Sequence, residues 1–169
     1  MKGLTMKNYL GVGISVGVLA GLWTQLSIEL TLITWVAFVA WACFFAAGGG
    51  RAGLVKGLAA NVSGVLWAYL ASLALEQATF NGAVAIAVAL LGFVLCVQAA
   101  LPLLSFIPGA FAGTALFFGT AFDLSGVLIA IVAGALLGIV SEVLGAKIQA
   151  SFDRTSAPTG PAPAPAAVA

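Results

Sequence analysis

From Tyr9 to Leu144 the sequence is a succession of apolar runs, most of them long enough to cross a bilayer as a helix. Only 7% of all residues are charged, whereas soluble domains carry about a quarter. A segment inside a bilayer must satisfy its backbone hydrogen bonds internally, and a helix does so. The sequence therefore predicts an all-α fold, a polytopic membrane helix bundle.

The apolar runs divide into six predicted transmembrane helices within one membrane domain, residues 1–149. They cover residues 9–26, 30–47, 57–75, 82–100, 103–122 and 124–144. The connection at 48–57 contains several glycines, so we expect a flexible hinge there. Residues 150–169 are rich in Pro, Ala, Ser and Thr, a composition typical of a disordered tail.

The charged residues fall between these segments in a consistent pattern. Basic residues accumulate on the cytoplasmic side of a membrane protein. If the N-terminus is cytoplasmic, six spans place all six Lys and Arg residues on that side. Glu29, Glu76 and Asp123 then fall on the opposite side. Five or seven spans would divide the basic residues, so we expect an even number with both termini cytoplasmic.

An internal repeat relates the two halves of the membrane domain. Residues 61–71 and 123–133 are identical at six of eleven positions. The second and fifth spans match around Ala37 and Ala110, and the first and fourth match more weakly, in the same order along the chain. Three spans separate each residue from its mate, so the mates run in opposite directions. This pattern predicts an inverted-topology repeat of three plus three helices.

Small residues recur at every fourth position in three of the spans. On a helix this spacing forms a smooth stripe against which a neighbouring backbone can pack closely. We therefore expect these residues to pack helices together, within one chain or in a homo-oligomer. The residues are Gly13, Gly17 and Gly21 in the first span, Gly64 and Ala68 in the third, and Gly126, Ala130 and Gly134 in the sixth.

Three short segments resemble a known family. They are Gly21 to Trp23, Ser63 to Ala68 and, most specifically, Leu103 to Gly113 with its Ser-Phe-Ile-Pro-Gly sequence. The membrane region resembles the domain-of-unknown-function family of small bacterial inner-membrane proteins that includes YcdZ. The resemblance implies a multi-pass protein of the bacterial inner membrane, and it implies no particular activity.

The residue types that carry most chemistry are missing from the spans. No Asp, Glu, Lys or Arg lies at the middle of a span, and the sequence contains no His. Cys43 and Cys96 lie in apolar runs, where a free Cys acts as a small hydrophobe. We therefore expect no enzyme activity, no metal site, no cofactor and no nucleic-acid partner. The lipid bilayer is the expected surrounding.

Two functions from different classes remain open. The repeat favours a passive channel or facilitator for a small neutral or weakly charged solute, because inverted repeats are typical of transporters. The small-residue stripes equally suit an accessory or scaffolding membrane protein that associates through these helix faces.

A solute path, if present, is expected near an interrupted fifth span. Pro108 and Gly109 mark the interruption, Ser105 precedes it, and Thr114 follows in the same span. Asn61 and Asp123 occupy matched positions that we expect at the starts of the third and sixth spans, as two vestibules of one route. The alternative interpretation also remains open: Pro108 starts a helix after a tight turn, and Asn61 and Asp123 are ordinary helix caps.

Overall fold

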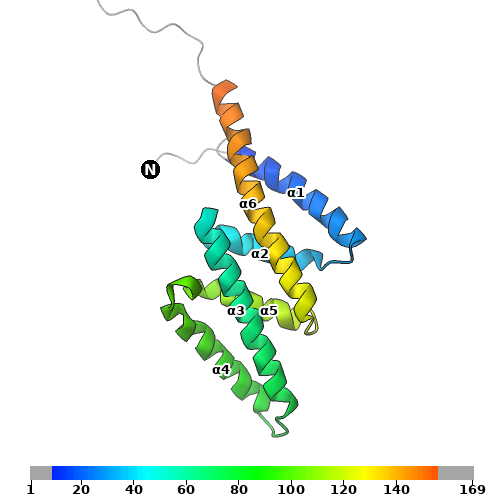
Figure 1. Cartoon of the computed structure of the whole chain (residues 1–169), viewed down its shortest axis with the longest axis vertical. Helices are drawn as coiled ribbons and strands as arrows, with labels where there is room; N and C mark the ends of the chain where they lie inside the picture. Colours follow the sequence, from blue (N-terminus) through cyan, green and yellow to red (C-terminus); the bar gives the residue numbers. More distant parts are fainter. Residues whose placement is uncertain (1–8, 156–169) are drawn as a thin grey trace, which may run out of the picture.

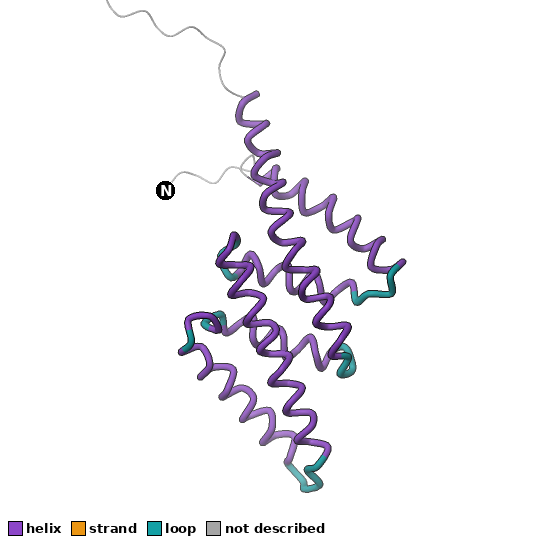
Figure 2. The backbone as a smooth tube through the Cα atoms, viewed as in Figure 1, coloured by secondary structure: helices purple, strands orange, loops and turns teal. Residues whose placement is uncertain are grey.

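The computed structural model describes residues 9–155, which form six α-helices joined by short turns (Figures 1 and 2). Over this range the structure contains no strand, so the all-α prediction is confirmed. Two 3-10 turns, η2 (Gln98–Ala100) and η3 (Pro102–Leu104), connect the fourth and fifth helices. The α-helices are α1 (Leu10–Glu29), α2 (Thr34–Ala46), α3 (Gly50–Glu76), α4 (Ala83–Val97), α5 (Ile107–Gly119) and α6 (Leu124–Thr155).

The helices fall into two length classes. Four are long and apolar enough to cross a membrane: α1, α3, α6, and α4 together with η2. Helices α2 and α5 have 13 residues each. At about 1.5 Å per residue they are roughly 20 Å long, shorter than the hydrocarbon core of about 30 Å. The six predicted segments are thus all helical, but two of them are helical over only part of their length.

Local chemistry explains why the two short helices begin late. Before α2, Thr31 has a φ of 52°, a left-handed conformation that ends the preceding helix. The hydroxyl groups of Ser27 and Thr34 then lie 2.6 Å apart and close this turn. At the start of α5, Pro108 occupies the first turn of the helix. Backbone N–H groups in a first turn have no acceptor within the helix, so the N–H that proline lacks is not missed there. The second of the two interpretations of Pro108, a helix start, is the observed one.

Helix α3 begins earlier than the sequence predicts. The chain is already helical from Gly50, so most of the predicted hinge at 48–57 is the first part of α3. Helix α6 in turn continues to Thr155, so the first residues of the predicted tail are helical. The rest of that tail, residues 156–169, lies outside the described residues.

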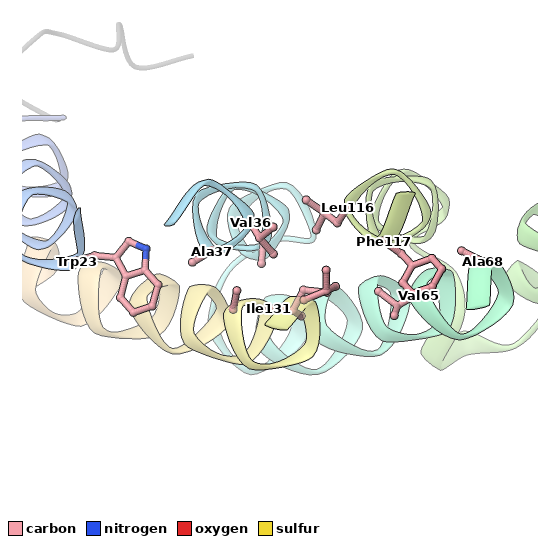
Figure 3. Close-up of a cluster of buried hydrophobic side chains, with 11 residues drawn as sticks. Trp23, Val36, Ala37, Val65, Ala68, Leu116, Phe117 and Ile131 are labelled. Carbon is pink, nitrogen blue, oxygen red and sulfur yellow. The ribbon is translucent and has the colours of Figure 1, made fainter. Parts of the chain in front are cut away.

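The helices form two layers with the main core between them. Helices α2 and α5 lie on one side and α6 and α3 on the other, as Figure 3 shows. The side chains of Val36 and Phe117 project from the first layer, and those of Val65 and Ile131 meet them from the second. All four are completely buried. Helix α1 packs beside α6, and α4 packs beside α3 (Figure 1).

Two close crossings hold the layers together. Where α5 crosses α3, a Cβ atom on Gly64 would overlap the carbonyl oxygen of Ala110. Where α2 crosses α6, a Cβ atom on Gly134 would overlap the carbonyl oxygen of Ala37. Each crossing therefore depends on a glycine in the longer helix. Ala68 and Ala130 are buried on the same faces of α3 and α6.

The crossings shift the register of the repeat. The sequence matches Gly64 with Gly126, but Gly126 lies against the side chains of Asp123 and Ile33. The glycine that takes the role of Gly64 in α6 is Gly134, about two turns farther along. Ile33, just before α2, lies beside Gly126 in the first turn of α6, and Ala37 of α2 reaches Gly134 farther along that helix.

The glycine stripe of α1 lies on the opposite face from the one that packs. Among the described residues, nothing lies within 4 Å of a Cβ atom built on Gly13, Gly17 or Gly21. The face of α1 that is buried carries Gly11, Ser15, Trp23 and Ser27. The prediction that this stripe packs against a neighbour is therefore corrected for a single copy of the chain, where it faces outward.

Candidate functional site at the crossing of α3 and α5

A buried asparagine lies where α3, α5 and α2 meet. Asn61 is 1% exposed, and its backbone carbonyl lies directly against Gly113 of α5. Because α3 begins at Gly50, Asn61 lies about three turns inside the helix and not at its start. Within the described part of the chain, its side-chain oxygen Oδ1 has no hydrogen-bond partner.

The neighbours of Asn61 are uncharged. Its side chain lies near the thiol of Cys43 on α2. On α5, the Thr114 hydroxyl donates to the Gly64 carbonyl at 3.1 Å. The crossing thus combines an amide, a thiol and a hydroxyl in an otherwise apolar core.

Three of the sequence-predicted path residues meet at this crossing. Gly109 lies against Ala60, the residue before Asn61, and Thr114 lies one turn beyond Gly109 on α5. Pro108 is exposed in the first turn of α5 and fixes where that helix begins. The structure therefore brings Asn61, Gly109 and Thr114 together around one point.

Two of the predicted path residues lie elsewhere. Ser105 is exposed, and its hydroxyl donates to the Pro102 carbonyl at 2.9 Å, within its own turn. Asp123 caps α6, where its Oδ1 accepts the N–H of Gly126 at 2.9 Å. The expected pair of vestibules at Asn61 and Asp123 is therefore corrected, because one residue lies inside the core and the other caps a helix.

A groove opens between α3 and α5 beyond the crossing. Its volume is about 660 Å³, and it is lined by residues that include Tyr69, Ser72, Glu76 and Phe122. The buried ring of Phe117 also lines this groove and packs edge-on against Tyr69, with 6.1 Å between ring centroids.

A second buried polar group joins α1, α2 and α6. The Ser15 hydroxyl donates to the Ser141 carbonyl at 2.8 Å, and the Trp41 indole N–H donates to the Ser141 hydroxyl at 2.9 Å. Both serines are buried, and each hydroxyl also reaches a carbonyl of its own helix. Sequence reasoning missed this group because its members are far apart in the chain. Every donor in this group is hydrogen bonded within the protein, so the group is a structural connection between the three helices.

A carboxylate completes the start of α3. Glu142 of α6 accepts the backbone N–H of Gly50 at 2.8 Å. The same carboxylate occupies the space beside Gly49, where a Cβ atom would lie 2.6 Å from Oε1. Gly49 has a φ of 66°, which also favours glycine. A negative charge at this position suits the positive end of the helix dipole. It also makes the glycine turn unsuitable for a second anion.

Comparison with known proteins identifies related bacterial sequences. Residues 13–146 match the family described as "Protein of unknown function (DUF1097)". The chain is 36% identical over 161 residues to the uncharacterized protein YahC of Escherichia coli, covering 88% of this chain and 94% of YahC. It is 30% identical over 156 residues to the inner membrane protein YcdZ of Escherichia coli, covering 89% and 94%. No solved structure matches the chain.

A further relative agrees with this assignment. The inner membrane protein YcdZ of Salmonella typhimurium is 29% identical over 161 residues, covering 91% of this chain and 98% of the relative. The family resemblance inferred from residues 103–113 is thereby confirmed. With four helices long and apolar enough to cross a membrane, the chain is a helical membrane protein and belongs to the DUF1097 family.

Proposed function

We propose that the protein is a passive, non-enzymatic facilitator for a small neutral solute across the inner membrane. The observation that carries this proposal is the pair of matched crossings. Helix α5 of the second half crosses α3 of the first at Ala110 and Gly64, and α2 of the first half crosses α6 of the second at Ala37 and Gly134. Each half packs its short helix across the long helix of the other half, although the glycine in α6 lies about two turns from the position that the sequence matches. This exchange supports an inverted repeat, the architecture typical of transporters.

The arrangement of the other helices supports the same repeat. In Figure 1, α1 lies beside α6 at one end of the molecule, and α4 lies beside α3 at the other. From N- to C-terminus, α3 and α6 point in opposite directions in space. A half-turn of the picture in its plane would roughly exchange the two halves. The proposal therefore includes six membrane-spanning helices, of which α2 and α5 are short and oblique.

The sidedness of the proposal rests on charge and on the position of the chain ends. The N–H of Gly11 donates to the side chain of Gln149 at 3.1 Å, so the start of α1 lies beside the last part of α6. Arg51 and Lys147 belong to the same end of the molecule, because Gly50 contacts Glu142. Basic residues favour the cytoplasmic side, so this end is assigned to the cytoplasm.

The polarity of the interior favours a neutral solute. In residues 9–154 the buried polar side chains are all uncharged: Ser15, Ser27, Asn61, Gln98 and Ser141. Ion-coupled transporters keep ionisable residues at this depth. The proposed route leads from the groove at Ser72 and Glu76 past Phe117 to Asn61. It continues past Cys43 toward the buried ring of Phe44.

A flux measurement tests the proposal. Purified protein is reconstituted into liposomes, and the rate of swelling in acetamide or urea is followed by light scattering. The proposal expects faster swelling than in protein-free liposomes of the same lipid and size. Equal rates for these and other small neutral solutes would contradict it.

A scaffolding function is the second candidate, and the outward stripe of α1 favours it. Gly13, Gly17 and Gly21 leave a smooth face that a helix of another copy can approach closely. Gly17→Leu would then weaken self-association in native mass spectra of the detergent-solubilised protein. Gly92→Leu is the matched control, since Gly92 also faces open space among the described atoms but stands alone on α4. Equal assembly in both variants and the wild type would remove this candidate.

A further inference from the structure

Asn61 presents a hydrogen-bond acceptor that the described part of the protein leaves unused. The residue is 1% exposed, and Oδ1 is itself enclosed. Buried acceptors in proteins are nearly always paired with the protein or with ordered water. An isosteric apolar side chain would fit the same space without the desolvation cost of the amide. The acceptor therefore points to a partner from outside the chain.

The surroundings define what kind of partner fits. The Thr114 hydroxyl is committed to the Gly64 carbonyl. A partner must then bring its own N–H or O–H group. A cation would find no carboxylate among the buried residues of the described chain, and an anion would be repelled by the carbonyl oxygen.

The close crossing limits the size of the partner. Gly113 lies against the Asn61 backbone, and Ala110 lies against Gly64 one turn away. Neither position has room for even a methyl group. Any partner of the amide must therefore be a molecule of only a few heavy atoms.

We propose that Asn61 is the contact point for a small, uncharged hydrogen-bond donor of the amide or alcohol class. The donor N–H or O–H group binds Oδ1 at the crossing of α3 and α5. This inference rests on the proposed facilitator function and deepens it, since it names the solute class and the residue that contacts it.

Side-chain NMR tests the contact directly. Asparagine is labelled with 15N at the side-chain amide, and the Asn61 signal is assigned by its loss in Asn61→Leu. Acetamide and acetone are the two probes, because they have the same shape and differ by an NH2 group in place of a methyl group. The inference expects a saturable shift of the Asn61 signal with acetamide and none with acetone. The signal of Asn81, which is exposed in a loop, serves as the internal control.

Flux measurements separate this inference from the broader proposal. Asn61→Leu should lower acetamide flux about tenfold, the effect of one lost hydrogen bond at the limiting step. Ser63→Ala should keep wild-type flux, since the Ser63 hydroxyl donates to Ala60 of its own helix at 2.8 Å. Thermal unfolding in detergent verifies that both variants are folded.

The outcomes distinguish the two claims. A specific acetamide shift without any flux in the wild type supports the donor site and contradicts the facilitator function. Flux that survives in Asn61→Leu, or an equal shift with acetone, overturns the donor site and leaves the facilitator function in place. Absence of an acetamide shift at saturating concentration also overturns the donor site.

Discussion

The carbonyl oxygen of Ala110 lies against the Cα atom of Gly64, with no room for a side chain between the two helices. Inside a membrane the hydrophobic effect does not drive helices together, because lipid is as apolar as the side chains. Close backbone contact of this kind supplies van der Waals packing instead. The contact also sets the position of α5 along α3, and with it the position of Asn61 relative to Thr114. The stability and the candidate site therefore depend on the same glycine.

Gly64→Ala should destabilise the protein by about 1 to 3 kcal/mol, because the new methyl group overpacks the crossing. The measurement is thermal or denaturant unfolding in detergent. Gly17→Ala is the matched control: the same change on the open face of α1 should be neutral or slightly stabilising, since alanine favours helices. Equal unfolding behaviour of the two variants would contradict the close crossing.

Asn61→Leu should stabilise the protein by about 1 kcal/mol, because it removes an acceptor that is buried without a partner. Unfolding of the purified variant in detergent measures the change. Ser63→Ala should stay within about 0.5 kcal/mol of the wild type. A large loss of stability in Asn61→Leu would mean that the amide is fully satisfied in the membrane.

Glu142→Ala should loosen the start of α3 by about 1 kcal/mol, the usual value of a helix cap. Hydrogen exchange of the amides at Gly50 and Gly53 should become faster, with little change near the other end of α3. Glu142→Gln keeps an oxygen acceptor and should show an intermediate effect. Glu29→Ala is the control, because Glu29 is also a carboxylate at a helix end but does not cap another helix. Unchanged exchange at Gly50 in Glu142→Ala would show that the contact does not hold the turn.

Reporter fusions after Arg51 and after Ala78 should report opposite sides of the membrane, with Arg51 cytoplasmic. Helix α3 lies between the two positions and is long enough to cross. A third fusion, after Arg154, should report the same side as Arg51. If the first two fusions report one side, α3 does not cross and the proposed number of crossings fails.

The sequence predicts the helices of this protein better than their contacts. Apolar runs and turn residues place six helices in the right order, because hydrophobicity and local turn chemistry are properties of short segments. The start of α3 could not be predicted in this way. It is completed by Glu142, a residue far away in the sequence that replaces a local cap at Gly50. Because the predicted start of this helix was several residues too late, Asn61 was expected near the helix start and not in its interior.

The stripes of small residues show a second limit. The spacing of Gly13, Gly17 and Gly21 indicates a face that a neighbour can approach, but Gly11 and Ser15 place small residues on the opposite face of the same helix as well. Ser15 has the partner Ser141, and this hydrogen bond selects the inward face. Which face is chosen depends on α6, and no local pattern in α1 carries that information. Part of the candidate site could be predicted, because Asn61 and Thr114 are polar residues that stand out in apolar segments.

The contact between Glu142 and Gly50 has a consequence for how the protein is made. Helix α3 leaves the ribosome long before α6, so its first turn must wait in the membrane without its carboxylate cap. Helix α2 must wait as well, because the glycine that it crosses, Gly134, is in the same late helix. The first three helices cannot reach their final packing until the last one is inserted. A chain interrupted before α6 should therefore be recognised as unfinished and removed by membrane proteases.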